Sequence, residues 1–166
     1  MRNRQKGFSL IELLIVVAII LIIAAIAIPN LLRSKMSANE AGAVGTLKTF
    51  NSVMVQYAST YSGPTPPCGF PPSLVNLGPG TPASADTADL IDNVLSASDT
   101  PSKAGYTYTY VQTNQDTNGC GVDYTLEARP VTFNTTGLRS FFTDQSGVIR
   151  GTPEDRSATV ADNPIT

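Results

Sequence analysis

The chain has 166 residues and a formal net charge of −2, with 11 Lys and Arg against 13 Asp and Glu. Nothing marks a strongly basic surface, so sequence-independent nucleic-acid binding has no electrostatic support. The sequence contains no histidine, which excludes Ser-His-Asp and Cys-His nucleophile systems and a haem-binding CxxCH motif. We therefore expect no enzyme activity, no metal and no cofactor.

A basic start and a long apolar run occupy the first 30 residues. No residue from Leu13 to Ile28 is polar, and residues 8–28 as a helix span roughly 31 Å, enough to cross a bilayer. The sequence therefore predicts a membrane helix over residues 8–29. The positive-inside rule keeps the preceding cations in the cytoplasm and places the chain after the helix outside. These cations are Arg2, Arg4 and Lys6.

A single carboxylate, Glu12, interrupts the apolar character of this helix. An isolated carboxylate in hydrocarbon costs about 2.5–3.5 kcal/mol even on the mildest insertion scales. No basic residue lies between Lys6 and Arg33, so Glu12 has no side-chain partner at its own depth. If the chain were cut between Gly7 and Phe8, a new α-amino group would lie one helical turn away. In a bundle of staggered copies, each Glu12 could then meet the amino terminus of a neighbour.

The residues around this acid read Lys6-Gly7-Phe8-Ser9-Leu10-Ile11-Glu12-Leu13-Leu14-Ile15-Val16-Val17-Ala18-Ile19-Ile20. This stretch resembles the cleavage and methylation segment of type IV prepilins and type II secretion pseudopilins. The resemblance implies that a membrane aspartyl peptidase removes residues 1–7 after Gly7 and methylates the new N-terminal Phe8. It also implies that Glu12 neutralises the N-terminus of an adjacent subunit during filament assembly.

The same resemblance implies partners and a location. The partners are further copies in a helical homopolymer, the prepilin peptidase and methyltransferase, and an inner-membrane platform protein with its assembly ATPase. The precursor is then a single-pass inner-membrane protein and the product an extracellular pilus that serves adhesion, motility or DNA uptake. Removal of the leader's three cations shifts the side-chain charge from −2 to −5.

Four alternatives stay open. Within the family, the chain could be the pseudopilin of a type II secretion system. From a different class, it could be a monomeric membrane-anchored binding module whose Pro/Thr-rich loop meets a ligand. The triplet Ala25-Ile26-Ala27 also fits an ordinary secretory signal cleaved near Ile28. A plain single-pass anchor is the fourth, and it leaves Glu12 unexplained.

Beyond Pro29 the apolar pattern becomes periodic and predicts an amphipathic continuation of the helix over residues 30–62. Gly63 and Pro64 end it. Pro29 removes one backbone hydrogen bond and predicts either a kink or a segment that melts in a filament. The apolar positions of the continuation are Leu32, Met36, Ala43, Val44, Leu47, Phe50, Met54, Val55, Ala58 and Tyr61.

Residues 63–104 are rich in proline and are predicted to form a loop with a short helix. Residues 73–78 are expected to form one helical turn, and residues 86–96 a short helix with one apolar face. Three acids recur at every third residue. Their negative charge is interpreted as stabilising the positive N-terminal end of that helix, with a cation site as the alternative. They are Asp86, Asp89 and Asp92.

Residues 105–166 are predicted to form an antiparallel sheet of about four strands and an irregular tail. Tyrosine alternates with threonine from Tyr106 to Tyr110, as in a half-buried strand. The expected strands cover residues 106–111, 122–128, 138–143 and 148–150. The fold class is therefore α+β, a long N-terminal helical spine packed against this sheet, and the resemblance implies the pilin fold.

The chain has two cysteines, Cys68 and Cys120, with no metal-ligand spacing. An even pair in an exported chain indicates a disulfide, which in the chain-entropy model stabilises the fold by roughly 4 kcal/mol. Two free buried thiols are the alternative. Pilins close a C-terminal disulfide-bounded loop, whereas here the predicted bond joins the loop after the helix to the strand region.

Overall fold

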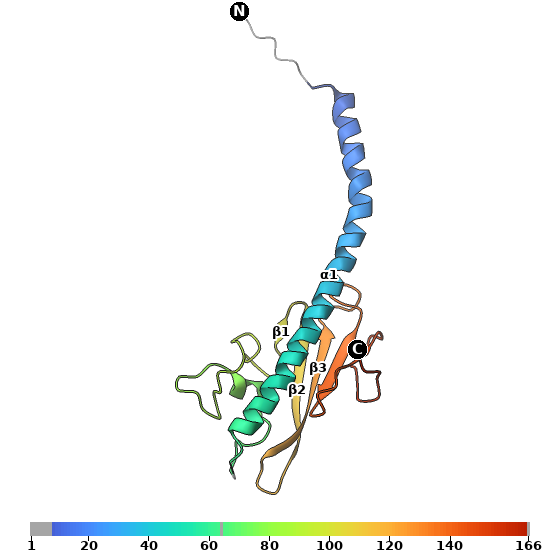
Figure 1. Ribbon diagram of the computed structural model, residues 1–166. Helices are drawn as coiled ribbons and strands as arrows, with labels where there is room; N and C mark the ends of the chain where they lie inside the picture. The colour runs from blue at the N-terminus through green and yellow to red at the C-terminus, as the bar shows by residue number, and fades with distance from the viewer. Residues whose placement is uncertain (1–7, 64, 166) are drawn as a thin grey trace, which may run out of the picture. The chain divides into compact units, whose positions relative to one another are not determined.

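The computed structural model describes residues 8–63 and 65–165, and the chain divides into two compact units, Met1–Lys35 and Met36–Thr166. A single α-helix crosses from the first unit into the second, and all the strands lie in the second (Figure 1). The elements are α1 (Leu10–Thr60), the 3-10 helix η1 (Leu74–Leu77), β1 (Ser102–Lys103), β2 (Tyr106–Gln115), β3 (Gly121–Pro130), β4 (Ser140–Asp144) and β5 (Arg150–Thr152).

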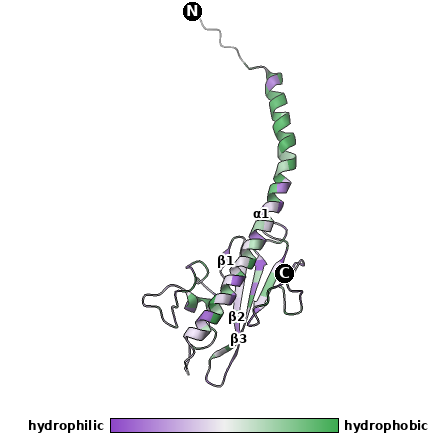
Figure 2. Ribbon diagram, viewed as in Figure 1, coloured by the Kyte–Doolittle hydropathy of each residue, from purple (hydrophilic) through white to green (hydrophobic). Residues whose placement is uncertain are grey.

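The first unit contains the part of α1 up to Lys35, and its large apolar side chains are exposed. Their exposed fractions run from 46% at Val17 to 76% at Leu10. Figure 2 shows this stretch as hydrophobic on the face in view, and by length and composition α1 is apolar enough to cross a membrane. Such a surface has no hydrophilic side to turn to water, so lipid or other apolar helices must cover it.

The second unit is built on an antiparallel sheet whose strands follow one another in chain order, β1-β2-β3-β4-β5. Side chains of β2 alternate between buried and partly exposed, and Tyr106, Tyr108 and Tyr110 point inward. The register pairs Tyr108 with Ala128 and Tyr110 with Leu126. The predicted α+β class and antiparallel sheet are confirmed. The sheet has five strands because the two-residue β1 adds to the four expected.

The core lies between the second half of α1 and this sheet. The buried α1 residues recur every three or four positions, so they form one face of the helix. Phe50 lies against Tyr108, with ring centroids 6.0 Å apart. Side chains from the Pro-rich loop, including Leu74 and Leu77, complete the same cluster. The apolar α1 residues in it are Ala43, Leu47, Phe50, Val53, Met54 and Tyr57.

The Pro-rich loop contains one predicted helical turn but not the other. The turn over residues 73–78 is confirmed as η1, where the Ser73 hydroxyl accepts a hydrogen bond from the Val75 N–H. The helix predicted over residues 86–96 is wrong. The backbone N–H groups of residues 88–91 donate to carbonyls of residues 76–78, and Asp89 has a left-handed φ of 54°. Tertiary hydrogen bonds have thus replaced the local helical ones.

The tail after β5 lies along that strand. The Gly151 N–H donates to the Asn163 carbonyl at 3.1 Å, and the Ile165 N–H donates to the Ile149 carbonyl at 2.9 Å. Arg156 binds the carboxylate of Asp162 through two nitrogens, at 2.9 and 2.6 Å. The tail predicted to be irregular therefore has a fixed path.

Candidate functional site

The acid in the apolar helix lies at the N-terminal end of α1. Because α1 begins at Leu10, Ser9 occupies the N-cap position and Glu12 is the third helical residue. The Ser9 N–H donates to Glu12 Oε2 at 3.4 Å, and the Leu13 N–H donates to the Ser9 carbonyl at 3.2 Å. The first bond is half of a capping box, a Ser or Thr followed three residues later by Glu or Gln.

This arrangement gives Glu12 a structural role within its own chain. The carboxylate lies at the positive end of the helix dipole, which favours negative charge there. One long backbone bond leaves most of its hydrogen-bonding capacity unused, and it makes no ion pair among residues 8–63 and 65–165. The Ser9-x-x-Glu12 signature was visible in the sequence, and the sequence analysis missed it.

The predicted processing site lies at the edge of the described chain. Phe8, the residue predicted to be methylated, is 80% exposed. Gly7 and the leader over residues 1–7 lie outside the described residues, so cleavage after Gly7 stays a prediction. Helix α1 continues through Pro29. Proline has no N–H to donate to the Ala25 carbonyl, and the predicted kink or melting there is likewise untested.

A carboxylate that the sequence analysis did not single out joins α1 to the sheet side of the second unit. Glu40, only 8% exposed, accepts hydrogen bonds from the Leu138 N–H at 2.8 Å and from Arg139 Nε at 2.9 Å. Beside it, Asn39 Nδ2 donates to the Thr136 carbonyl at 2.8 Å. The sequence held one hint, an acid next to the apolar positions of an amphipathic helix. Its partners are nearly a hundred residues away, so the sequence could not identify them.

Cys68 and Cys120 form the predicted disulfide, at a sequence separation of 52. The bond holds the Pro-rich loop against the start of β3. Next to it, the Gly121 N–H donates to the Cys68 carbonyl and the Phe70 N–H donates to the Gly121 carbonyl, both at 2.9 Å. The disulfide and these backbone bonds fasten a loop that is otherwise poor in regular structure.

The three spaced acids do not act as predicted. With no helix over residues 86–96, they cannot favour its N-terminal end. The Asp92 carboxylate accepts from the N–H groups of Val94 and Leu95 and pairs with Lys103 Nζ at 2.6 Å. The hydrogen bond from Lys103 lowers the pKa of Asp92. Within the described residues, no three His, Cys, Asp or Glu side chains are grouped to hold a metal.

Comparison with known proteins places the N-terminal segment in a family. The model of the prokaryotic N-terminal methylation motif matches residues 2–28. The chain is 65% identical over 40 residues to the type IV wide pilus major component PilA4 of Thermus thermophilus, covering 24% of this chain and 30% of that protein. It is 41% identical over 76 residues to the type IV major pilin PilA of Myxococcus xanthus, covering 44% and 34%. The N-terminal segment of the chain is therefore similar to that of type IV pilins.

The similar proteins include a secretion-system protein as well as pilins. The type II secretion system core protein G of Dickeya chrysanthemi is 33% identical over 57 residues, covering 34% of this chain and 37% of that protein. The chain thus spans about a third of the length of these curated relatives. No solved structure matches it. The methylation-motif match, residues 2–28, ends within the first part of α1.

Proposed function

We propose that the chain is the structural subunit of a type IV pilus, exported as a prepilin, cleaved after Gly7 and methylated at Phe8. It polymerises through the first half of α1. The observation that carries this proposal is the exposed apolar surface of residues 10–32 next to the methylation motif. A helix apolar on its whole circumference is covered either by lipid or by other helices.

Assembly exchanges one of these environments for the other. The precursor is held in the inner membrane by α1 until the platform protein and assembly ATPase extract it. In the filament, side chains of neighbouring copies replace lipid, so the apolar surface stays covered and van der Waals packing supplies the attraction. Cleavage is required first because it creates the Phe8 amine.

The charge pair sets the axial position of each copy. An apolar helix packed among apolar helices slides easily, because one axial offset buries nearly as much surface as another. A pair between Glu12 of one copy and the Phe8 amine of its neighbour is satisfied at one offset alone. In a site with little water this pair is far stronger than at a surface. The free acceptor capacity of Glu12 beyond its Ser9 bond is available for it.

The test uses two substitutions of the same residue in cells that make filaments. Glu12→Ala removes the charge and the cap, whereas Glu12→Gln removes the charge and keeps an oxygen that accepts from the Ser9 N–H. Both variants should be exported and cleaved like the wild type, and both should yield no filaments by electron microscopy. Abundant normal filaments from either variant would contradict the charge-pair mechanism. Loss with Glu12→Ala alone would assign the residue to capping.

An intact mass of protein sheared from the cell surface tests processing directly. The expected species begins at methylated Phe8 and sediments with fibres. A soluble species that begins near Pro29 would show that the opening run is a secretory signal, and the filament proposal would be wrong. An uncut monomer in the membrane would favour an anchored binding module.

A second candidate is a pseudopilin of a type II secretion system. The similarity to core protein G, 33% identical over 57 residues, favours it. Long surface fibres made by this chain at its natural level support the pilus, and their absence together with a secretion defect supports the pseudopilin.

A further inference from the structure

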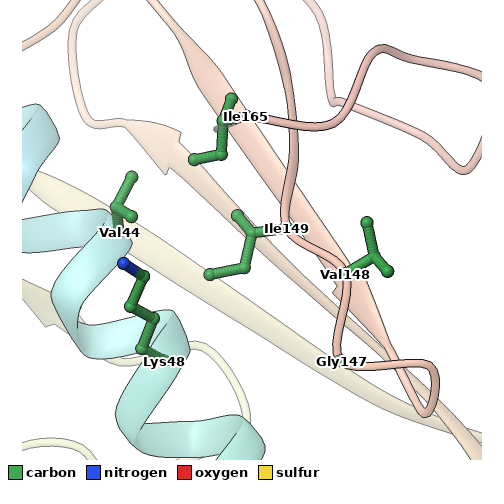
Figure 3. A pocket seen from close by; sticks show the side chains of 6 residues that line it. All are labelled: Val44, Lys48, Gly147, Val148, Ile149 and Ile165. Atoms are coloured by element: carbon green, nitrogen blue, oxygen red, sulfur yellow. The ribbon is translucent and has the colours of Figure 1, made fainter.

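A hollow beside the second half of α1 combines an apolar lining with one cation. Its volume is about 290 Å³. Figure 3 shows Lys48 on the helix side of the hollow, with Ile149, Val148 and Ile165 across from it. Lys48 makes no ion pair with any residue that the structure describes. We call this hollow the Lys48 groove; it is lined by Val44, Lys48, Gly147, Val148, Ile149 and Ile165.

The opposite side of α1 carries the complementary chemistry. Residues 86–94 are here called the acidic loop, and its residues 90–92 line a second hollow together with Gly42, Gly45 and Thr49 of the helix. The part of the chain that contains this loop lies on one side of α1 and the C-terminal tail on the other (Figure 1). The loop exposes Val94, at 53%, together with its three acids. One side of the unit therefore presents an exposed valine among carboxylates, and the other presents an apolar hollow beside a free ammonium.

The acidic loop is held in place before any partner arrives. The Asp89 N–H donates to the Gly78 carbonyl and the Ala88 N–H donates to the Asn76 carbonyl, both at 2.8 Å. The buried side chains of Ile91 and Leu95 anchor it in the core. Asp92 is already paired with Lys103, whereas Asp89 makes no ion pair in the described chain. A fixed loop loses little conformational entropy on docking.

We propose that the acidic loop of one copy docks into the Lys48 groove of the next, with Val94 in the hollow and Asp89 facing Lys48. The inference rests on the proposed function in one respect, because α1 must bring the copies side by side. The occupant is a second copy because both complementary surfaces belong to the same chain. Since they lie on opposite sides of α1, the contact is heterologous and each docked copy keeps one surface of each kind free.

The contact contributes register more than affinity. An exposed Lys–Asp pair contributes little because water and salt screen it, and one buried valine adds only a small apolar area. Neither holds two copies together against the entropy of association. In a filament already joined by α1 this entropy has been lost, so a weak complementary contact is enough to fix how neighbouring second units are rotated.

Cysteine cross-linking tests the contact in filaments of the full chain. Val94→Cys and Val148→Cys, placed together in one chain, put a thiol on each surface, and filaments sheared from cells are oxidised gently. We expect a ladder of covalent multimers on non-reducing gels, because each copy links to two neighbours. Either single variant is the matched control and should give no ladder. The peptide mass of the native Cys68–Cys120 disulfide verifies correct pairing.

The outcomes separate this inference from the proposed function. Filaments of the double variant with no ladder would overturn the docking and leave the pilus proposal intact. A wild-type chain that forms no filaments would instead overturn the pilus proposal. Covalent dimers from both single variants would show non-specific oxidation and would likewise count against the docking.

A double-mutant cycle keeps the test decisive if the cysteine variants fail to assemble. Lys48→Gln and Asp89→Asn are suitable changes, because asparagine tolerates the left-handed φ of residue 89. Each should lower the urea midpoint for filament dissociation, and the double variant should match the single ones. The charge control is Asp155→Asn, an exposed acid paired with Arg129 outside both surfaces, and it should leave the midpoint unchanged. Fully additive losses, or no loss from either change, would overturn the docking.

Discussion

The two parts of α1 follow different physical rules. Residues 10–35 expose apolar side chains, whereas residues 36–60 bury one face against the sheet and leave small and polar residues outside. The second part is stabilised by its own chain, because its buried residues belong to the core of the second unit. The first part depends on lipid or on other copies for its cover. A single helix can therefore carry folding in one part and assembly in the other.

The largest expected effect comes from the disulfide, which lies in the second unit. Replacing both Cys68 and Cys120 by serine should lower the free energy of unfolding by about 4 kcal/mol, because the unfolded chain regains the entropy of a 52-residue loop. Denaturant unfolding of the full chain in detergent, followed by near-ultraviolet circular dichroism, measures the loss. Reduced wild type should behave like the variant, and an unchanged midpoint would contradict the prediction.

Two matched substitutions by alanine test whether the two parts of α1 differ in their contribution to folding. Leu47→Ala removes a side chain with no exposed surface and should cost about 2–5 kcal/mol of unfolding free energy. Ile19→Ala removes a side chain that is 52% exposed and should leave the same unfolding transition unchanged. Equal losses in the two variants would show that the first part also belongs to the core.

The buried carboxylate at the start of the packed part should have a smaller effect. Glu40→Ala leaves the Leu138 N–H and Arg139 without their acceptor and should cost about 1.5–3 kcal/mol. Glu40→Gln keeps an acceptor for the Leu138 N–H and should cost less, since Arg139 is half exposed and its ion pair is screened. Denaturant unfolding measures the free energy of unfolding of both variants. A larger loss of this free energy in Glu40→Gln than in Glu40→Ala would contradict the prediction.

The smallest effect is expected from alkaline pH, which should act on the second unit and leave its stability at neutral pH unchanged. Burial raises the pKa of Tyr57 and of Tyr124 to about 12, from an ordinary value of 10.0. Because the folded state holds these protons more tightly, their contribution is full below pH 10 and is lost as the pH rises toward 12. Tyrosinate absorbance and circular dichroism should change together in that window. Full ionisation of all tyrosines near pH 10 without unfolding would contradict the burial.

Local patterns predicted most of the fold, and long-range contacts account for what they missed. The apolar run, the 3.6-residue period of α1 and the alternating tyrosines of β2 are local, and they gave the right elements. The 86–96 segment has a good helical pattern, but its backbone bonds to residues 76–78 prevail over propensity. Strand β1 has two residues and no period to detect; its pairing with Tyr106 and Thr107 defines it.

The residues of the candidate site also fall into two groups, those that the local sequence reveals and those whose role depends on long-range contacts. Glu12 stands out in sequence because a carboxylate is rare in an apolar run, and Phe8 follows from the motif around it. Glu40 and Lys48 look like ordinary polar residues of an amphipathic helix. Their significance depends on Arg139 and Ile149, which the fold brings beside them.

The tail along β5 has a consequence for solubility at high concentration. Open sheet edges present unpaired N–H and C=O groups and invite strand addition, the route to amyloid-like aggregates. Here residues 163–165 already take hydrogen bonds beside β5, and β1 on the other edge is two residues long. A crowded population of these subunits is thereby protected from irreversible sheet stacking. Any orderly growth is left to side-chain surfaces, which can separate again.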